Sequence, residues 1–204
     1  MPPPIRPARA EAGALPGGQA SPFVLYVEGP RDRDLLRIWC QRHQPGSVES
    51  VRSAVILGGR QPLRALQHFE GLRATEPDAR GLCVLDRDHG GEPAPPPADP
   101  ALEFFTWSRR HIESYLLVPH ALHRVAREKK ERFRIDRFVR EFLPKQSDEE
   151  AWRRLDAKRL IERDGPLARE VGRPLPAAAI ARALRGDELH EDIAAVLGRL
   201  HPPA

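Results

Sequence analysis

The stretch FVLYVEG, residues 23–29, decides the fold class. Its first five residues are aromatic, aliphatic or β-branched, a composition typical of a buried β-strand, and the Gly-Pro pair at 29–30 ends that strand. The segment 32–42 then carries Leu35 and Leu36, followed by further apolar residues at helical spacing. A buried strand that leads directly into an amphipathic helix predicts the first unit of an α/β fold.

Three more segments continue this alternation. Strands are expected at 51–57, which ends at Gly58-Gly59, at 81–85 and at 102–106, and a helix that begins at Pro62 separates the first two of them. Strands that alternate with helices predict a parallel sheet of about four strands, flanked by crossover helices. In such sheets, functional residues gather at the carboxyl ends of the strands.

From about residue 110 onward the pattern is helical. In the last of these helices Asp187 suits the N-cap, and the apolar stripe from Leu189 to Leu200 is expected to pack internally. We therefore expect a disordered, proline-rich tail at 1–21, a catalytic core at 22–120 and a helical extension packed on that core at 121–204. The helices of this extension and of the segment before it are expected at 110–118, 119–129, 131–143, 148–163, 176–185 and 187–200.

The composition indicates in which cellular environment the protein is expected. The chain has 204 residues, of which 40% are hydrophobic and 30% charged, and no apolar run approaches the about 18 residues that a membrane span needs. The amino-terminal segment lacks the apolar centre of a secretory signal. Cys40 and Cys83 are the only cysteines, which makes a disulfide framework improbable. These features predict a cytoplasmic protein without membrane contact.

The charges are unevenly distributed along the chain. Residues 22–106 carry 10 basic and 12 acidic side chains, whereas residues 107–163 carry 16 basic and 10 acidic ones. The second region would suit a polyanion such as DNA or RNA, and Arg127, Lys129 and Lys130 are candidate nucleic-acid contacts within it. The plain alternative is that these side chains form solvated helix faces or a protein-docking surface.

Acidic residues follow two of the expected strands. Glu28 comes directly after the first strand, and Asp86 and Asp88 come after the third. If the sheet is parallel, these carboxylates converge, and hard oxygen ligands without a Cys or His cluster favour Mg²⁺ or Mn²⁺. The alternative for each aspartate alone is that it merely caps the next helix or turn.

These motifs resemble those of a known family. The order V-E-G at 27–29, a glycine turn at 58–59 and L-D-R-D at 85–88 is similar to that of the TOPRIM domain of topoisomerases, bacterial primases and recombination-repair proteins. The segment W-S-R-R-H-I-E-S-Y-L-L at 107–117 resembles more specifically the nucleases of the overcoming-lysogenization-defect (OLD) family. The resemblance covers roughly residues 23–120.

The resemblance implies a role for each matching residue. Glu28 would be a metal ligand or proton acceptor, Asp86 and Asp88 metal ligands, and Asp32 a second acidic position near the first helix. Glu113 would complete a site for two ions, which clamp the attacking and leaving oxygens of a phosphodiester. Lys158 would lie near the scissile phosphate, whereas Arg109 and Arg110 are placed to grip phosphate. For Asp32 and Glu113 the alternative is a helix-start carboxylate, for Lys158 a solvated side chain, and for the two arginines simple pairing with nearby acids.

Full-length OLD nucleases carry an ATPase domain, and this sequence has no G-x-x-x-x-G-K-[ST] phosphate-binding loop. The resemblance therefore implies a metal-dependent nuclease acting on DNA or RNA as an effector of bacterial anti-phage defence, under the control of a separate ATPase. Two alternatives stay open: a primase-like nucleotidyl transferase, and a non-catalytic TOPRIM-fold module that binds nucleic acid or regulates a partner. Assembly of several copies also stays open.

Overall fold

The protein is an α/β structure built on a four-stranded parallel sheet, as expected. The computed structural model describes residues 22–87 and 99–200; the tail at 1–21 and Asp88 lie outside the described residues. The sheet has the strand order β2-β1-β3-β4. The two central strands pair so that Val27 lies beside Val84 near the carboxyl ends of both strands. The strands are β1 (Phe23–Val27), β2 (Val55–Ile56), β3 (Arg80–Leu85) and β4 (Leu102–Thr106).

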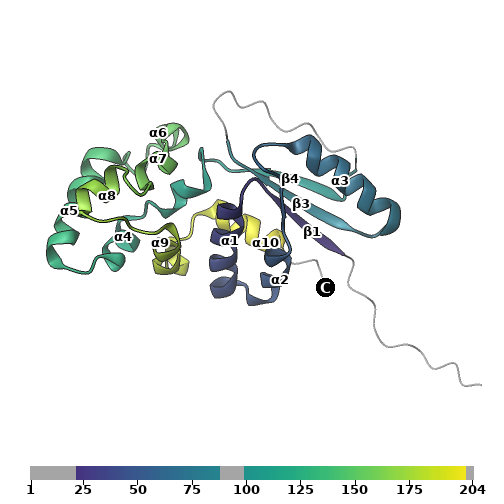
Figure 1. Cartoon of the computed structure of the whole chain (residues 1–204), viewed down its shortest axis with the longest axis horizontal. Coiled ribbons are helices and arrows are strands. Elements are labelled where there is room, and N and C mark those ends of the chain that lie inside the picture. Colours follow the sequence, from purple (N-terminus) through teal and green to yellow (C-terminus); the bar gives the residue numbers. More distant parts are fainter. Residues whose placement is uncertain (1–21, 88–98, 201–204) are drawn as a thin grey trace, which may run out of the picture.

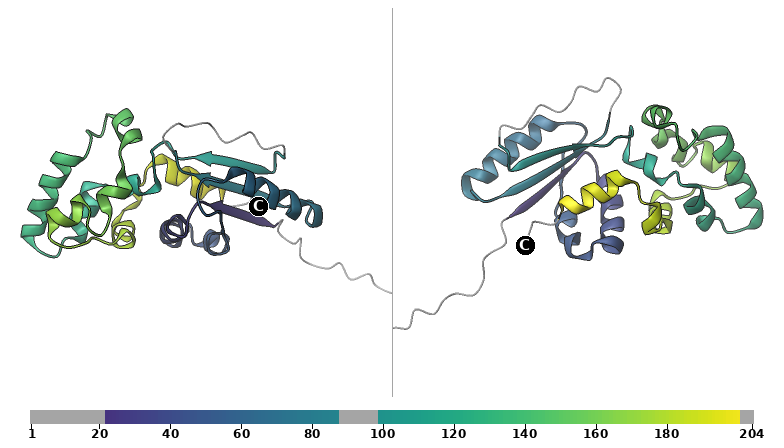
Figure 2. Two further views of the ribbon diagram at one scale, coloured as in Figure 1. Left: turned by 45° about the horizontal axis from the view of Figure 1, so that its top comes forward. Right: turned by 180° about the vertical axis from the view of Figure 1, so that it is seen from behind.

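Helices cover both faces of the sheet (Figures 1 and 2). Helix α3 (Pro62–Thr75) packs on one face, against Tyr26 and its neighbours, whereas α1 (Pro30–His43) and α10 (Glu191–Arg199) pack on the other, against Leu25 and Val27. The alternation follows from the strand geometry, since successive side chains of a strand point to opposite faces. Both faces are therefore apolar, and the polar residues of β1 and β3 begin only at the strand ends.

The prediction of a strand at 51–57 is wrong for its first half. Residues Val48–Arg52 form helix α2, which follows a 3-10 turn, η1 (Pro45–Ser47), and only Val55 and Ile56 pair with β1. Val48 and Val51 are three residues apart, so a helix turns both toward α1, where Val51 is fully buried. The same spacing in a strand would have directed them to opposite faces.

The part of the chain after β4 is helical, but most of its elements are shorter than expected; α5 is the exception. Residues 110–118 contain a 3-10 helix, and the segment 148–163 is divided because the Asp156 side chain caps a new helix by accepting from the Arg159 N–H. The last helix begins at Glu191, later than predicted. The elements are η2 (Ile112–Leu116), α4 (Pro119–Val125), α5 (Lys129–Phe142), α6 (Glu149–Arg154), α7 (Ala157–Ile161), α8 (Pro166–Val171), α9 (Ala177–Ala183), η3 (Gly186–Glu188) and α10.

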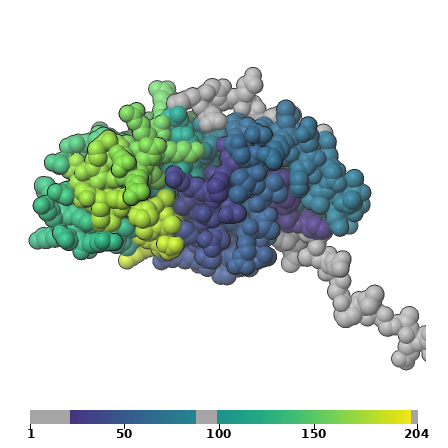
Figure 3. Space-filling model, viewed as in Figure 1, coloured from purple at the N-terminus to yellow at the C-terminus, as the bar shows by residue number. Residues whose placement is uncertain are grey.

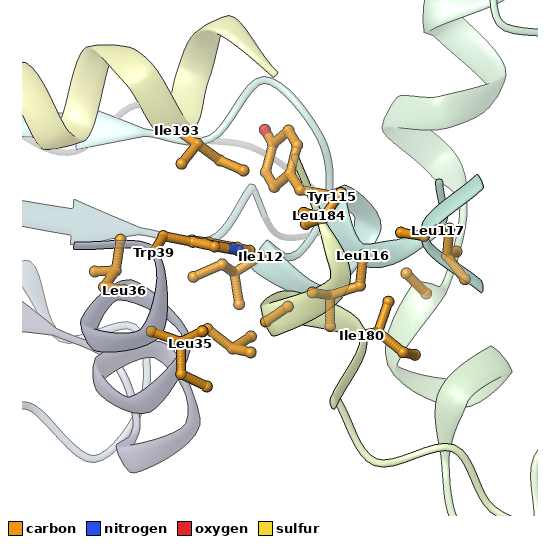
Figure 4. Packing of buried hydrophobic residues seen from close by; sticks show 14 of the residues in the cluster. Leu35, Leu36, Trp39, Ile112, Tyr115, Leu116, Leu117, Ile180, Leu184 and Ile193 are labelled. Carbon is orange, nitrogen blue, oxygen red and sulfur yellow. The ribbon is translucent and has the colours of Figure 1, made fainter. Parts of the chain in front are cut away.

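One apolar cluster joins the sheet to the helical part. Figure 4 shows Trp39 of α1, Ile112 and Tyr115 of η2, Leu184 after α9 and Ile193 of α10 around a shared interior, and all five are buried. The surface of α1 lies between those of α9 and α3 on the face shown in Figure 3, and α9 packs directly on α1. The apolar stripe of the last helix packs internally, as predicted, since Ile193, Val196, Leu197 and Leu200 are all buried. No helix in the described ranges is both long and apolar enough to cross a membrane.

Candidate active site

Glu28 and Asp86 lie side by side at the carboxyl ends of β1 and β3. The two strands are neighbours in the sheet, and the backbone N–H of Asp86 donates a 2.7 Å hydrogen bond to Oε1 of Glu28. The Asp86 carbonyl oxygen in turn accepts from the guanidinium of Arg60, a residue that the sequence did not single out. The parallel sheet thus brings these two acidic residues together.

The glycine pair after β2 holds the backbone of Glu28. The N–H groups of Gly58 and Gly59 both donate to the Glu28 carbonyl oxygen, each at 3.0 Å. Both glycines have positive φ, 80° and 115°, a backbone conformation that side chains with a Cβ rarely adopt. The two glycines therefore hold the Glu28 backbone in place at the carboxyl end of the sheet.

Asp32 lies in the first turn of α1, where it both caps the helix and faces the acidic centre. Its Oδ2 accepts from the Gly29 N–H at 3.0 Å, so the expected alternative of a helix-start carboxylate is also observed. Burial, followed by the negative charges of Asp86 and Glu113, raises the pKa of Asp32 to about 7. The carboxyl group therefore lies in a field of like charge.

Glu113 enters the centre from η2. Its side chain is 1% exposed; Oε1 accepts from Arg31 Nη1 at 3.2 Å, whereas Oε2 has no hydrogen-bond partner among the described residues. Burial raises the pKa of Glu113. A buried carboxylate oxygen without a donor is costly, and the charges of Lys158 and Asp86 act on this carboxyl group.

Lys158 of α7 supplies a positive charge at the acidic centre. Its Nζ lies 2.6 Å from Oδ2 of Asp86, and Oδ1 of Asp86 accepts from the Ile112 N–H at 3.3 Å. Asp86 is 2% exposed, whereas the Lys158 side chain is 43% exposed and so reaches solvent. Burial lowers the pKa of Lys158, but the hydrogen bond to Asp86 and the charges of Asp86, Glu113 and Asp32 together outweigh it and raise the pKa overall. The lysine is thus charged and placed at the mouth of the site.

Helix α10 fixes the segment that carries Glu113. The Asp192 carboxylate accepts hydrogen bonds from the Tyr115 hydroxyl, from the Ser108 hydroxyl and, at 2.9 Å, from the Ser108 N–H. Tyr115 also accepts from the Arg109 N–H at 3.2 Å. This network holds both ends of the loop from β4 to η2, and sequence spacing gave no signal of it.

The remaining predicted residues lie in other surroundings. The Arg109 guanidinium stacks over the Trp152 ring at 4.3 Å and pairs with Glu149 at 3.1 Å, and Arg110 pairs with Asp156 at 3.3 Å. Both arginines therefore make the acid pairs that were expected as the alternative to phosphate binding. The three basic residues expected to contact nucleic acid are exposed around the start of α5, at the end of the helical part away from the sheet (Figure 1); they are Arg127, Lys129 and Lys130.

His111 is a further buried group at the centre that the sequence did not assign. It is 5% exposed, and its Nδ1 lies 4.0 Å from an Asp156 oxygen without a hydrogen bond. Burial and the nearby Lys158 charge lower its pKa. A neutral imidazole at this place adds no positive charge to the acidic centre.

Across residues 22–87 and 99–200, no three Asp, Glu, His or Cys side chains are arranged closely enough to hold a metal ion as they stand. Asp86 instead contacts the Lys158 ammonium. Comparison of the chain with known protein families, curated proteins and solved structures gives no match.

Proposed function

We propose that the protein is a divalent-metal-dependent nuclease that hydrolyses phosphodiester bonds in DNA or RNA. The observation that carries the proposal is the meeting of Glu28 and Asp86 at the ends of two central parallel strands, with Asp32 and Glu113 buried beside them. The charges of Asp86 and Glu113 act on Asp32, and Glu28 adjoins this group through its hydrogen bond with the Asp86 N–H. The proposal includes a TOPRIM-type domain, which the motifs at 27–29, 85–88 and 107–117 resemble.

The donor set suits Mg²⁺ or Mn²⁺. Its groups are hard carboxylate oxygens, which these cations prefer, and one buried oxygen, Oε2 of Glu113, has no hydrogen-bond donor within the described residues. Burial is the main cause that raises the pKa of Asp32, and the negative charges of Asp86 and Glu113 add to it, against the opposing charge of Lys158. Asp86, Glu28, Asp32 and Glu113 would hold the ions, together with Asp88. A bound divalent cation would orient and activate the attacking water and polarise the phosphate as a Lewis acid.

The side chains around the carboxylates supply positive charge for a phosphate. Lys158 Nζ is half-exposed at the mouth of the site, where it would face a phosphoryl oxygen and stabilise charge that develops on it. Arg31 is 56% exposed while its guanidinium contacts Glu113, so its remaining N–H groups face solvent beside the centre. Glu28 holds the Asp86 backbone and thereby fixes the position of the Asp86 carboxylate.

A role as an effector of anti-phage defence, controlled by a separate ATPase, belongs to the same proposal. It is supported by the resemblance to the OLD nucleases and by the lack of a phosphate-binding loop in this sequence. The proposed partners are thus nucleic acid and an ATPase, and the proposed cofactor is a pair of Mg²⁺ or Mn²⁺ ions.

The test is cleavage of plasmid DNA, single-stranded DNA and RNA by the purified full chain, with and without Mg²⁺ or Mn²⁺. We expect cleavage only with metal, and a loss on the order of a hundredfold or more in Asp32→Asn and Asp86→Asn. Asp34→Asn is the matched control, because Asp34 is on the same helix but is half-exposed and, within the described ranges, pairs only with Arg33. Native-like cleavage activity in Asp32→Asn and Asp86→Asn, or cleavage that persists in EDTA, would refute the proposal.

A further inference from the structure

The outward face of α5 carries an exposed aromatic ring among cations. Lys129, Phe133, Arg137 and Arg140 follow one another at spacings of four, four and three residues, which places them along one side of a helix. Phe133 is 70% exposed, more than any other large hydrophobic side chain in the described ranges. The buried side of α5 already supplies Ile135 and Phe138 to the core. Packing among residues 22–87 and 99–200 therefore gives no reason for an aromatic residue on the outward side.

Most of the positive charge on this face is not neutralised by neighbouring acids. Arg137 pairs with Glu170 of α8, and Asp136 contacts His123 of α4. The other cations of the helix surface form no ion pair with any residue in 22–87 or 99–200. These unpaired cations are Lys129, Lys130, Arg132 and Arg140.

We propose that this face of α5 binds single-stranded nucleic acid, with Phe133 stacked on a base and the unpaired cations holding phosphates on either side. Aromatic rings interleaved with cations are the pattern by which proteins bind single strands, because every base offers a π-face to an aromatic side chain. In a duplex the bases are stacked on one another, so their faces are closed to an exposed aromatic ring. The inference rests on the proposed nuclease function and adds single strands as its substrate class.

A cavity connects α5 with the segment that leads to the carboxylates. It has a volume of about 800 Å³ and is lined by Arg140 and Lys145 from α5 and the residues after it, and by Arg109 and Tyr115 from the loop and η2. Glu113 lies in the same short helix as Tyr115. The cavity thus joins the carboxyl end of α5 to the loop before η2, and Arg140 and Lys145 bring positive charge to its rim beside the acidic Asp187 and Glu188.

Binding can be measured separately from cleavage. We would titrate the full chain, in EDTA, into a fluorescently labelled single strand and into the duplex of the same sequence, and follow anisotropy. Loss of one stacked base is worth about 1–3 kcal/mol, so we expect Phe133→Ala to weaken single-strand binding on the order of tenfold and to leave duplex binding unchanged. Phe133→Trp should keep single-strand affinity, whereas Lys129→Glu should weaken both ligands and reduce the salt dependence.

Leu63→Ala is the control for removal of an exposed apolar side chain, because Leu63 is 64% exposed on α3 and lies outside this face. Unchanged single-strand affinity in Phe133→Ala, or equal losses for single strand and duplex, overturns the proposal. So does a dimer that Phe133→Ala converts to a monomer in sedimentation experiments, because the ring would then belong to an interface between copies. A chain that binds single strands through Phe133 but cleaves nothing with Mg²⁺ or Mn²⁺ refutes the nuclease function and leaves the binding face intact.

Discussion

The ammonium group of Lys158 lies 2.6 Å from Oδ2 of Asp86 and joins α7 to the end of β3 across 72 positions of the sequence. The Asp86 carboxylate is buried, whereas the Lys158 side chain reaches solvent. The ion pair therefore extends from the interior of the protein to its surface. In the proposed site, a metal ion at Asp86 and the ammonium group would both place positive charge at the Asp86 carboxylate. Binding of the ion would therefore be coupled to the position of this lysine.

Replacement of the lysine should destabilise the metal-free protein. Lys158→Met leaves a buried carboxylate without its cation, and we expect a loss of about 1–2 kcal/mol in the free energy of unfolding, because Lys158 is partly screened by solvent. Mg²⁺ should restore much of this loss, since it supplies the missing charge. Urea denaturation with and without Mg²⁺ measures both effects. Lys130→Met, at an exposed position without an ion pair among the described residues, should show neither.

Metal binding should raise the thermal stability of the native protein through Asp86. A ligand that binds only the folded state adds RT ln(1 + [L]/Kd), or about 2.7 kcal/mol at a concentration of 100 Kd. We expect Tm to rise with Mg²⁺ in the native chain and in Asp34→Asn, but not in Asp86→Asn. Isothermal titration calorimetry of the same three proteins provides the direct measurement. An Asp86→Asn protein that binds Mg²⁺ as the native one does contradicts the assignment.

Two substitutions of Glu28 should distinguish its structural role from its chemical role. Its carboxylate accepts the buried N–H of Asp86, and loss of that acceptor costs about 1–3 kcal/mol. Glu28→Ala should therefore lower stability as well as abolish cleavage. Glu28→Gln keeps an oxygen acceptor at this position, so it should retain most of the stability while losing the charge that cleavage requires. Thermal melts run beside cleavage assays distinguish the two variants; similar activity in Glu28→Gln and the native chain contradicts a chemical role.

Acid should weaken the contact between α5 and the loop after α8. The hydrogen bond from Arg173 is the main cause that lowers the pKa of Glu131 from its ordinary 4.5 to about 2. A lowered folded-state pKa means that Glu131 contributes stability above about pH 4.5 and that this contribution is lost as the pH falls toward 2. The difference in unfolding free energy between the native chain and Glu131→Gln should therefore shrink below pH 4.5. Glu141→Gln, an exposed change on the same helix, should show no such trend in urea titrations across this pH range.

The network around Asp192 should position Glu113 rather than take part in chemistry. Asp192→Asn and Tyr115→Phe each remove part of the set of hydrogen bonds that holds the loop and η2 on α10. We expect each variant to lower stability by about 1–3 kcal/mol and to weaken Mg²⁺ binding in calorimetry, because Glu113 loses its fixed place. Native-like Mg²⁺ affinity in a folded but destabilised variant would assign the network a purely structural role.

Sequence reasoning was most accurate for the sheet. Strand β1 and residues 81–85 of β3 are continuous runs without a charged residue that end at an acidic residue, and a central strand buried on both faces needs such a run. The edge strand β4 was also predicted, although Glu103 interrupts its apolar residues. Sequence reasoning was least accurate where a segment is short. Residues 48–52 have an apolar spacing that fits a helix as well as a strand, and the six-residue α8 was not expected, although Pro166 and the left-handed Gly172 mark its two ends.

The candidate site was predictable only as far as strand topology determines it. Glu28 and Asp86 follow neighbouring parallel strands, so their proximity follows from the fold. The contact between Lys158 and Asp86 and the burial of Glu113 depend on how helices after β4 return to the sheet, which local periodicity does not encode. The resemblance to the OLD nucleases indicated Lys158 and Glu113 as site residues. Neither the resemblance nor the residue spacing indicated Asp192 or Arg60.

The apolar cluster shared by α1, η2, α9 and α10 has a consequence for how the molecule comes apart. A boundary drawn after residue 120 would cut through this interior and leave Trp39 and Ile112 without the side chains of Ile180, Leu184 and Ile193. The sheet and the helices after it therefore cannot melt independently: calorimetry should record one transition whose van't Hoff and calorimetric enthalpies agree. The acidic centre and its lysine, which come from opposite sides of that boundary, would be lost in the same step.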